Sequence, residues 1–165
     1  MFENRTVPCI LETPFFDVHD LEKATYDAFF DDDDATRAGS LRAILHRKDL
    51  HDEAVPLALE FLTDSSLELR GFMLATIIAM IRENRCRISL ISRYSLCRII
   101  ERFALGDLLP WGTAARCHLG DPTVLEFASA WLSSHETPLR TKADHVMKRT
   151  CITICAGETP AAWIF

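Results

Sequence analysis

The sequence predicts an all-α chain in which helical hairpins stack one on another. The first observation is a repeated spacing, since Asp31–Arg37 recurs 33 residues later as Asp64–Arg70, with an apolar segment after each arginine. The second is that turn residues divide the remaining apolar stretches into pieces of helical length. A period in the thirties is typical of stacked helical hairpins, which need neighbours to cover their apolar faces.

Eight segments have apolar residues at helical spacing, and in sequence order they pair into about four hairpins. We expect helices over residues 17–30, 35–47, 52–62, 64–83, 88–105, 109–119, 122–133 and 134–150.

Acidic residues mark the starts of the first four helices, because a short carboxylate accepts hydrogen bonds from the free amides of a first turn. The Asp31–Asp34 run forms the turn before the second helix. Asp52 precedes the third helix, in which Pro56 lies near the tolerated first turn. The fourth helix follows Asp64 and is apolar nearly all round, which predicts that it is enclosed by other helices.

Turns rich in glycine, asparagine and proline separate the later helices. Residues 84–87 turn the chain before the fifth helix, whose expected inward stripe includes Ile91 and Ile99. Gly106 ends that helix, and residues 120–122 (Gly, Asp, Pro) provide a helix end, an N-cap and a first helical position. Apart from residues 152–154, no segment shows a strand-like pattern.

The 165 residues are expected to form a single domain. Residues 1–16 are predicted to be an N-terminal arm, residues 17–150 the helical repeats, and residues 151–165 a C-terminal cap or tail. The N-terminus resembles no secretory signal, and the longest apolar run, residues 71–81, is too short to span a bilayer. We therefore expect a cytoplasmic protein with no membrane part. Six cysteines among apolar neighbours predict reduced, buried thiols.

The Asp-to-Arg spacing and the apolar helix after it resemble the turn and second helix of a HEAT repeat. Three segments show it, the last with serine in place of the aspartate: Asp31–Arg37, Asp64–Arg70 and Ser134–Arg140. The resemblance covers about residues 31–150, although the unit at 88–119 lacks the spacing. It implies a short right-handed solenoid of about four HEAT-like hairpins, in which the aspartates and arginines of neighbouring repeats tie the turns together.

No pattern indicates an enzyme, a cofactor or a metal centre. Cys117 and His118 are adjacent on a helix, so their side chains point about 100° apart and are poorly placed to act as a nucleophile and its base. The Asp31–Asp34 run lacks the glycine and distal glutamate of a calcium-binding loop. Residues 151 and 155 are cysteines, but no second pair accompanies them at zinc-site spacing.

Charge is unevenly distributed along this chain of net charge −6. Residues 12–34 contain nine acids and one lysine, whereas residues 82–102 contain six arginines and two glutamates. The acidic segment suits a basic partner, while the arginines form either an ion-paired surface or a basic surface for an acidic partner. The candidate partner-binding residues are Asp27, Asp31, Asp32, Asp33, Asp34, Arg98, Arg102 and Trp163.

These features predict a protein-binding module, and more specifically a small immunity-type inhibitor that binds a basic toxin or enzyme. The overall negative charge disfavours nucleic acid as the partner. Two alternatives stay open. One is a HEAT-like enzyme acting on nucleic acid, similar to alkylpurine DNA glycosylases, with the arginines of residues 82–102 in its groove. The other is a scaffold or assembly factor that docks through Trp163.

Overall fold

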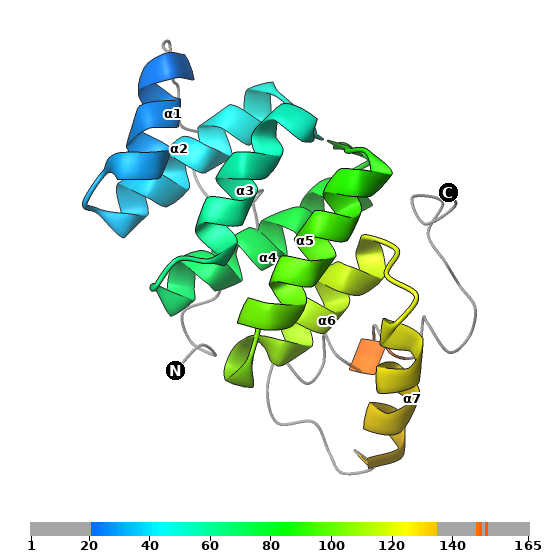
Figure 1. Cartoon of the computed structure of the whole chain (residues 1–165). Coiled ribbons are helices and arrows are strands. Elements are labelled where there is room, and N and C mark those ends of the chain that lie inside the picture. The colour runs from blue at the N-terminus through cyan, green and yellow to red at the C-terminus, as the bar shows by residue number, and fades with distance from the viewer. Residues whose placement is uncertain (1–20, 135–147, 150, 152–165) are drawn as a thin grey trace.

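The computed structural model describes residues 21–134, 148–149 and 151, and this part of the chain is mostly helical (Figure 1). Its α-helices are α1 (Leu21–Phe30), α2 (Asp34–Arg47), α3 (Val55–Leu62), α4 (Leu67–Arg82), α5 (Leu90–Phe103), α6 (Leu109–His118) and α7 (Val124–Ser134). Two 3₁₀ turns and two very short strands lie between them: η1 (Asp52–Ala54), η2 (Gly106–Leu108), β1 (Leu50–His51) and β2 (Cys86–Arg87). The prediction of an all-α chain is confirmed for these residues.

Consecutive helices pack as pairs, α1 with α2, α3 with α4 and α5 with α6 (Figure 1). Each pair also contacts the next, because α3 touches both α1 and α5, and α4 touches both α2 and α6. The six helices therefore lie in two rows, with α7 against α6. The expected arm, the tail and nearly all of the eighth helix lie outside the described residues.

The core lies between the two rows, and α4 contributes most to it. Met73, Ile77 and Met80 are completely buried, as expected for a helix that is apolar nearly all round. The inward face of α5 differs from the predicted stripe. Its buried residues include Leu96 and Ile100, whereas Ile91 is 79% exposed. Several faces of α5 carry apolar residues, so the spacing of these residues alone did not identify the buried face.

The strands β1 and β2 were not predicted, since two residues are too few to show alternation. They pair in parallel, with Leu50 opposite Cys86, and so join the connection before α3 to the connection before α5. Beside them, Arg85 donates from Nε to Asp49 Oδ1 (3.0 Å) and from Nη2 to the carbonyl oxygen of Leu45 (2.6 Å). Arg85 thereby satisfies a carbonyl in the last turn of α2, which has no partner within its own helix.

Gly112 lets α6 approach α5 closely. A Cβ at this position would overlap that of Ala104 and lie 3.2 Å from Cγ2 of Ile100. Gly112→Ala is therefore expected to lower the free energy of unfolding by about 1–3 kcal/mol through overpacking, although alanine favours helices in general. Urea unfolding of the single variant and of the double variant with Ala104→Gly, which restores the space, measures the effect. A single variant as stable as the original chain would contradict the close approach.

Candidate functional site

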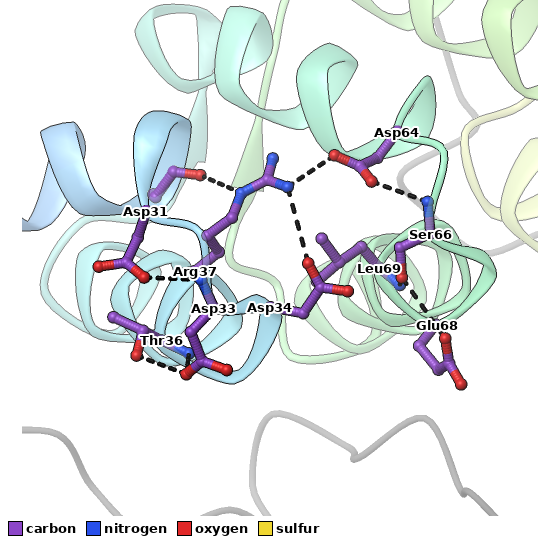
Figure 2. Close-up of polar contacts among 10 residues, drawn as sticks. Asp31, Asp33, Asp34, Thr36, Arg37, Asp64, Ser66, Glu68 and Leu69 are labelled. Atoms are coloured by element: carbon purple, nitrogen blue, oxygen red, sulfur yellow. Dashed lines mark hydrogen bonds and ion pairs between the residues drawn. The ribbon is translucent and has the colours of Figure 1, made fainter.

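Arg37 joins the first hairpin to the second and is almost completely buried (Figure 2). Its Nη1 donates to Asp64 Oδ2 at 2.7 Å, and its Nε donates to the carbonyl oxygen of Ala28 at 3.1 Å. The guanidinium also lies over the ring of Phe61, 5.2 Å from its centroid. Only 9% of the Arg37 side chain and 13% of the Asp64 side chain are exposed. This arginine is thus a structural tie and unavailable to a partner.

The Asp64 carboxylate is held ionised by this arrangement. Burial raises the pKa of Asp64, but hydrogen bonds from the Ser66 amide and from Arg37, and the charge of Arg37, lower it by more. Arg70 occupies the matching position in the second hairpin, and its Nη1 donates to the carbonyl oxygen of Phe103 at 3.3 Å. The charge of Arg70 also lowers the pKa of Asp64. Arg140 lies outside the described residues.

The carboxylates of the acidic run differ in their surroundings, and Figure 2 shows the contacts of Asp31, Asp33 and Asp34. Asp31 Oδ1 accepts from the Asp33 amide at 2.8 Å, and Asp33 caps α2 by accepting from the Thr36 amide at 3.0 Å. The Thr36 hydroxyl and amide lower the pKa of Asp33. Asp32 is exposed and contacts no basic group of the described chain. Asp34 is 53% exposed, with its carboxylate 3.9 Å from Arg37.

The α1 helix carries exposed aromatic residues directly before this run. Tyr26 and Phe30 are 65% and 67% exposed, and their ring centroids lie 5.1 Å apart. Phe29, at 5.8 Å from the Phe30 ring, extends the cluster toward the core. Asp27 is on the same helix and forms an ion pair with Lys23 at 2.8 Å. We call Tyr26, Phe30, Asp32 and Asp34 the α1 surface.

The arginines of residues 82–102 have different surroundings, so they do not act as one basic stripe. Arg85 is used in the tie to α2, and Arg87 lies 3.4 Å from Asp49. Arg98 pairs with Glu101 at 2.8 Å, both well exposed, whereas Arg102 lies over the Phe103 ring at 5.7 Å from its centroid. Of the two predicted arginines, Arg98 lines a pocket that Arg102 does not line.

That pocket has a volume of about 290 Å³ and lies between α5 and the turn that joins α6 to α7. Leu90, Tyr94 and Arg98 line it from α5, and Leu119 and Pro122 line it from the turn. Leu90 is 59% exposed and Tyr94 is 67% exposed. Sequence reasoning recognised Arg98 but missed the pocket, because its two walls, residues 90–101 and 116–123, come from separate parts of the chain.

Burial keeps Cys97, Cys117 and His118 in their neutral forms. Burial raises the pKa of the Cys97 thiol to about 12, with a further contribution from Asp121, and burial also raises the pKa of Cys117. His118 is mostly buried, and this burial lowers its pKa to about 4. Neutral thiols are poor nucleophiles. Among the described residues, no group of His, Cys, Asp and Glu is placed to hold a metal ion.

Trp163 lies outside the described residues. In the part of the chain that the structure covers, no helix has the length and apolar content needed to cross a membrane. The candidate sites are therefore the α1 surface and the pocket beside α5. Comparisons of the chain with family models, curated proteins and solved structures gave no match.

Proposed function

We propose that the chain is a protein-binding helical-repeat module whose α1 surface receives a basic partner protein. The observation that carries this proposal is the exposed ring pair of Tyr26 and Phe30, followed directly in the chain by the exposed residues Asp32 and Asp34. Exposed aromatic rings provide large contact area and attract arginine or lysine over their faces. Neighbouring carboxylates steer a positively charged protein into contact.

The arrangement of helices supports a HEAT-like solenoid as the framework. Paired helices lie in two rows, and Arg37 contacts Asp64, one repeat away along the chain. The strand pairing of Leu50 with Cys86 joins equivalent connections of consecutive hairpins. A solenoid of this type offers an extended concave surface to which a partner protein binds. Within this class, we favour an intracellular immunity-type inhibitor of a basic toxin or enzyme, on the strength of the acidic end and the lack of a catalytic arrangement among the described residues.

A binding experiment with the full chain tests the proposal. The immobilised chain is used to isolate partner proteins, and each one is titrated against variants of the α1 surface at several salt concentrations. The double variant Tyr26→Ala with Asp32→Asn is expected to weaken binding about tenfold or more and to reduce its salt dependence. Leu105→Ala, which truncates a similarly exposed apolar side chain outside both candidate sites, is the matched control. If no protein is isolated, or if affinity and salt dependence stay unchanged in the double variant, the proposal fails.

The nucleic-acid alternative has less support from the contacts. Arg85 is engaged with α2, and Arg98 and Arg87 each lie beside a carboxylate. A gel-shift experiment at low salt tests this alternative, since phosphate binding is strongest there. The scaffold alternative is tested by removing residues 163–165 and measuring whether assembly with a partner is lost.

A further inference from the structure

We propose that Arg42 anchors the acidic segment of residues 12–20 to α2, through an ion pair between its guanidinium and one carboxylate of that segment. The contact is internal to the chain and does not depend on the function proposed for the α1 surface. Three observations support it: a buried arginine without a partner among the described residues, the distribution of acids in the rest of the chain, and the place where the segment joins α1.

Arg42 is a buried cation that lacks a partner among the described residues. It lies in α2 and is 7% exposed. No described residue forms a hydrogen bond or an ion pair with its guanidinium, and burial alone accounts for the lowered pKa of this group. A buried charge without a partner is strongly unfavourable, because it has lost its hydration and gained no attraction in return. We therefore expect the group that balances Arg42 to lie outside the described part of the chain.

Two other arginines with largely buried side chains each contact a carboxylate. The side chain of Arg37 is 9% exposed and lies 2.7 Å from Asp64. The side chain of Arg116 is 15% exposed and lies 2.8 Å from Asp121. Charge-assisted hydrogen bonds of this kind offset much of the cost of burying the two groups. The same requirement applies to Arg42, so we expect its partner to be a carboxylate.

The distribution of acids outside the described residues points to residues 12–20. This segment has no lysine or arginine, and it contains three carboxylates, those of Glu12, Asp17 and Asp20. Residues 1–11 contain one acid and one arginine, so they carry no net negative charge. The acids of residues 135–165 follow α7, which packs against α6 at the other end of the described helices. Residues 12–20 are therefore the acidic segment that adjoins the first hairpin, where Arg42 lies.

The chain enters α1 beside the part of α2 that carries Arg42. The two helices pack together and are joined by a turn of three residues, so they run in roughly opposite directions (Figure 1). The ten residues of α1 extend about 15 Å along its axis, and the nine residues from Asp34 to Arg42 extend about 13 Å along theirs. Leu21, the start of α1, therefore lies at nearly the same level as Arg42. Nine extended residues span at most about 30 Å, so a carboxylate of residues 12–20 is within reach.

Covalent attachment favours this segment over a carboxylate of another protein. A group joined by a short stretch of chain acts at an effective concentration on the order of millimolar. A foreign carboxylate at lower concentration would have to displace it, so residues 12–20 compete for Arg42 with any acidic partner. The anchored segment thus withholds a cation at the acidic end of the chain from other molecules.

Chymotrypsin cleavage after Phe15 and Phe16 tests the proposal on the purified full chain, since both bonds lie within the anchored segment. The cleavage rate follows the fraction of chains in which the segment is released. Arg42→Met removes the charge and is expected to raise this rate about tenfold or more, whereas Arg42→Lys keeps the charge and should raise it less. Arg98→Met, which removes an exposed arginine of α5, is the matched control and should leave the rate unchanged. Mass spectrometry counts cuts at these two bonds separately from cuts within α2 to α6, which report general unfolding.

Neutralising the acids one at a time identifies the partner of Arg42. One of the changes Glu12→Gln, Asp17→Asn and Asp20→Asn should raise cleavage as much as Arg42→Met does, and adding Arg42→Met to that variant should have little further effect.

Three results would overturn the proposal. The first is an unchanged cleavage rate in Arg42→Met. The second is an effect of Arg42→Met that persists in full when all three acids are neutralised, since the partner then lies elsewhere. The third is protection that is lost on dilution, which would assign the carboxylate to a second copy. Because no partner protein is present, these results are independent of binding at the α1 surface.

Discussion

Replacing Arg37 by alanine is expected to lower the free energy of unfolding by about 3–5 kcal/mol, the usual cost of removing one member of a buried ion pair. The substitution leaves the Asp64 carboxylate, only 13% exposed, without its 2.7 Å partner. It also removes the donor to the Ala28 carbonyl oxygen and the cation from the face of Phe61. The first hairpin would then lose a buried polar tie to the second.

Chemical denaturation of matched variants measures this effect. Arg98→Ala removes an arginine from an exposed pair, with 62% and 46% of the two side chains accessible, and is expected to cost at most about 0.5 kcal/mol. Replacing Arg37 by methionine and Asp64 by leucine together should be far less harmful than either change alone, since no charge is left buried. An Arg37→Ala variant that unfolds at the same denaturant concentration as Arg98→Ala would contradict the role of Arg37.

Stability is expected to fall between pH 6.5 and pH 4 because of His118. Burial lowers the pKa of this histidine from 6.5 to about 4 in the folded chain. The unfolded chain therefore takes up the proton first, so the contribution of neutral His118 to stability is complete above pH 6.5 and is lost as the pH falls to 4. The loss amounts to about 3 kcal/mol. Unfolding in urea at closely spaced pH values measures it.

His118→Gln provides the comparison, since glutamine stays neutral throughout this range. The variant should lose less stability than the original chain between pH 7 and pH 4. The carboxylates with lowered pKa, such as Asp64, lose their contribution only as the pH falls below about 4. Equal slopes for the original chain and His118→Gln would show that this histidine is protonated as readily in the folded chain as in the unfolded one.

The helices were predictable because local residues determine them. Asp33 and Ser66 cap α2 and α4 through their own side chains, and Pro56 lies in the first turn of α3. Such signals act within a few residues and are visible in the sequence. The pairing of Leu50 with Cys86 depends on two connections that only the packed hairpins bring together, so local pattern gave no sign of it.

The candidate sites were only partly predictable, for a similar reason. The sequence shows the charge of Asp31–Asp34, but it does not show which carboxylates face solvent. The conformation of the turn decides this, since it places Asp33 as the cap of α2 and leaves Asp32 exposed. The sequence also leaves open which side of a helix faces solvent. Ile91 was expected inside and lies outside, because α5 buries the side that carries Leu96.

The ties between hairpins also affect how the chain folds. Arg37 contacts Asp64, Arg85 contacts Asp49, and Leu50 pairs with Cys86, so each of these contacts closes a loop of 27 to 36 residues. Contacts of short sequence separation are formed early and with little loss of loop entropy. We therefore expect folding to proceed rapidly by addition of one hairpin to the next.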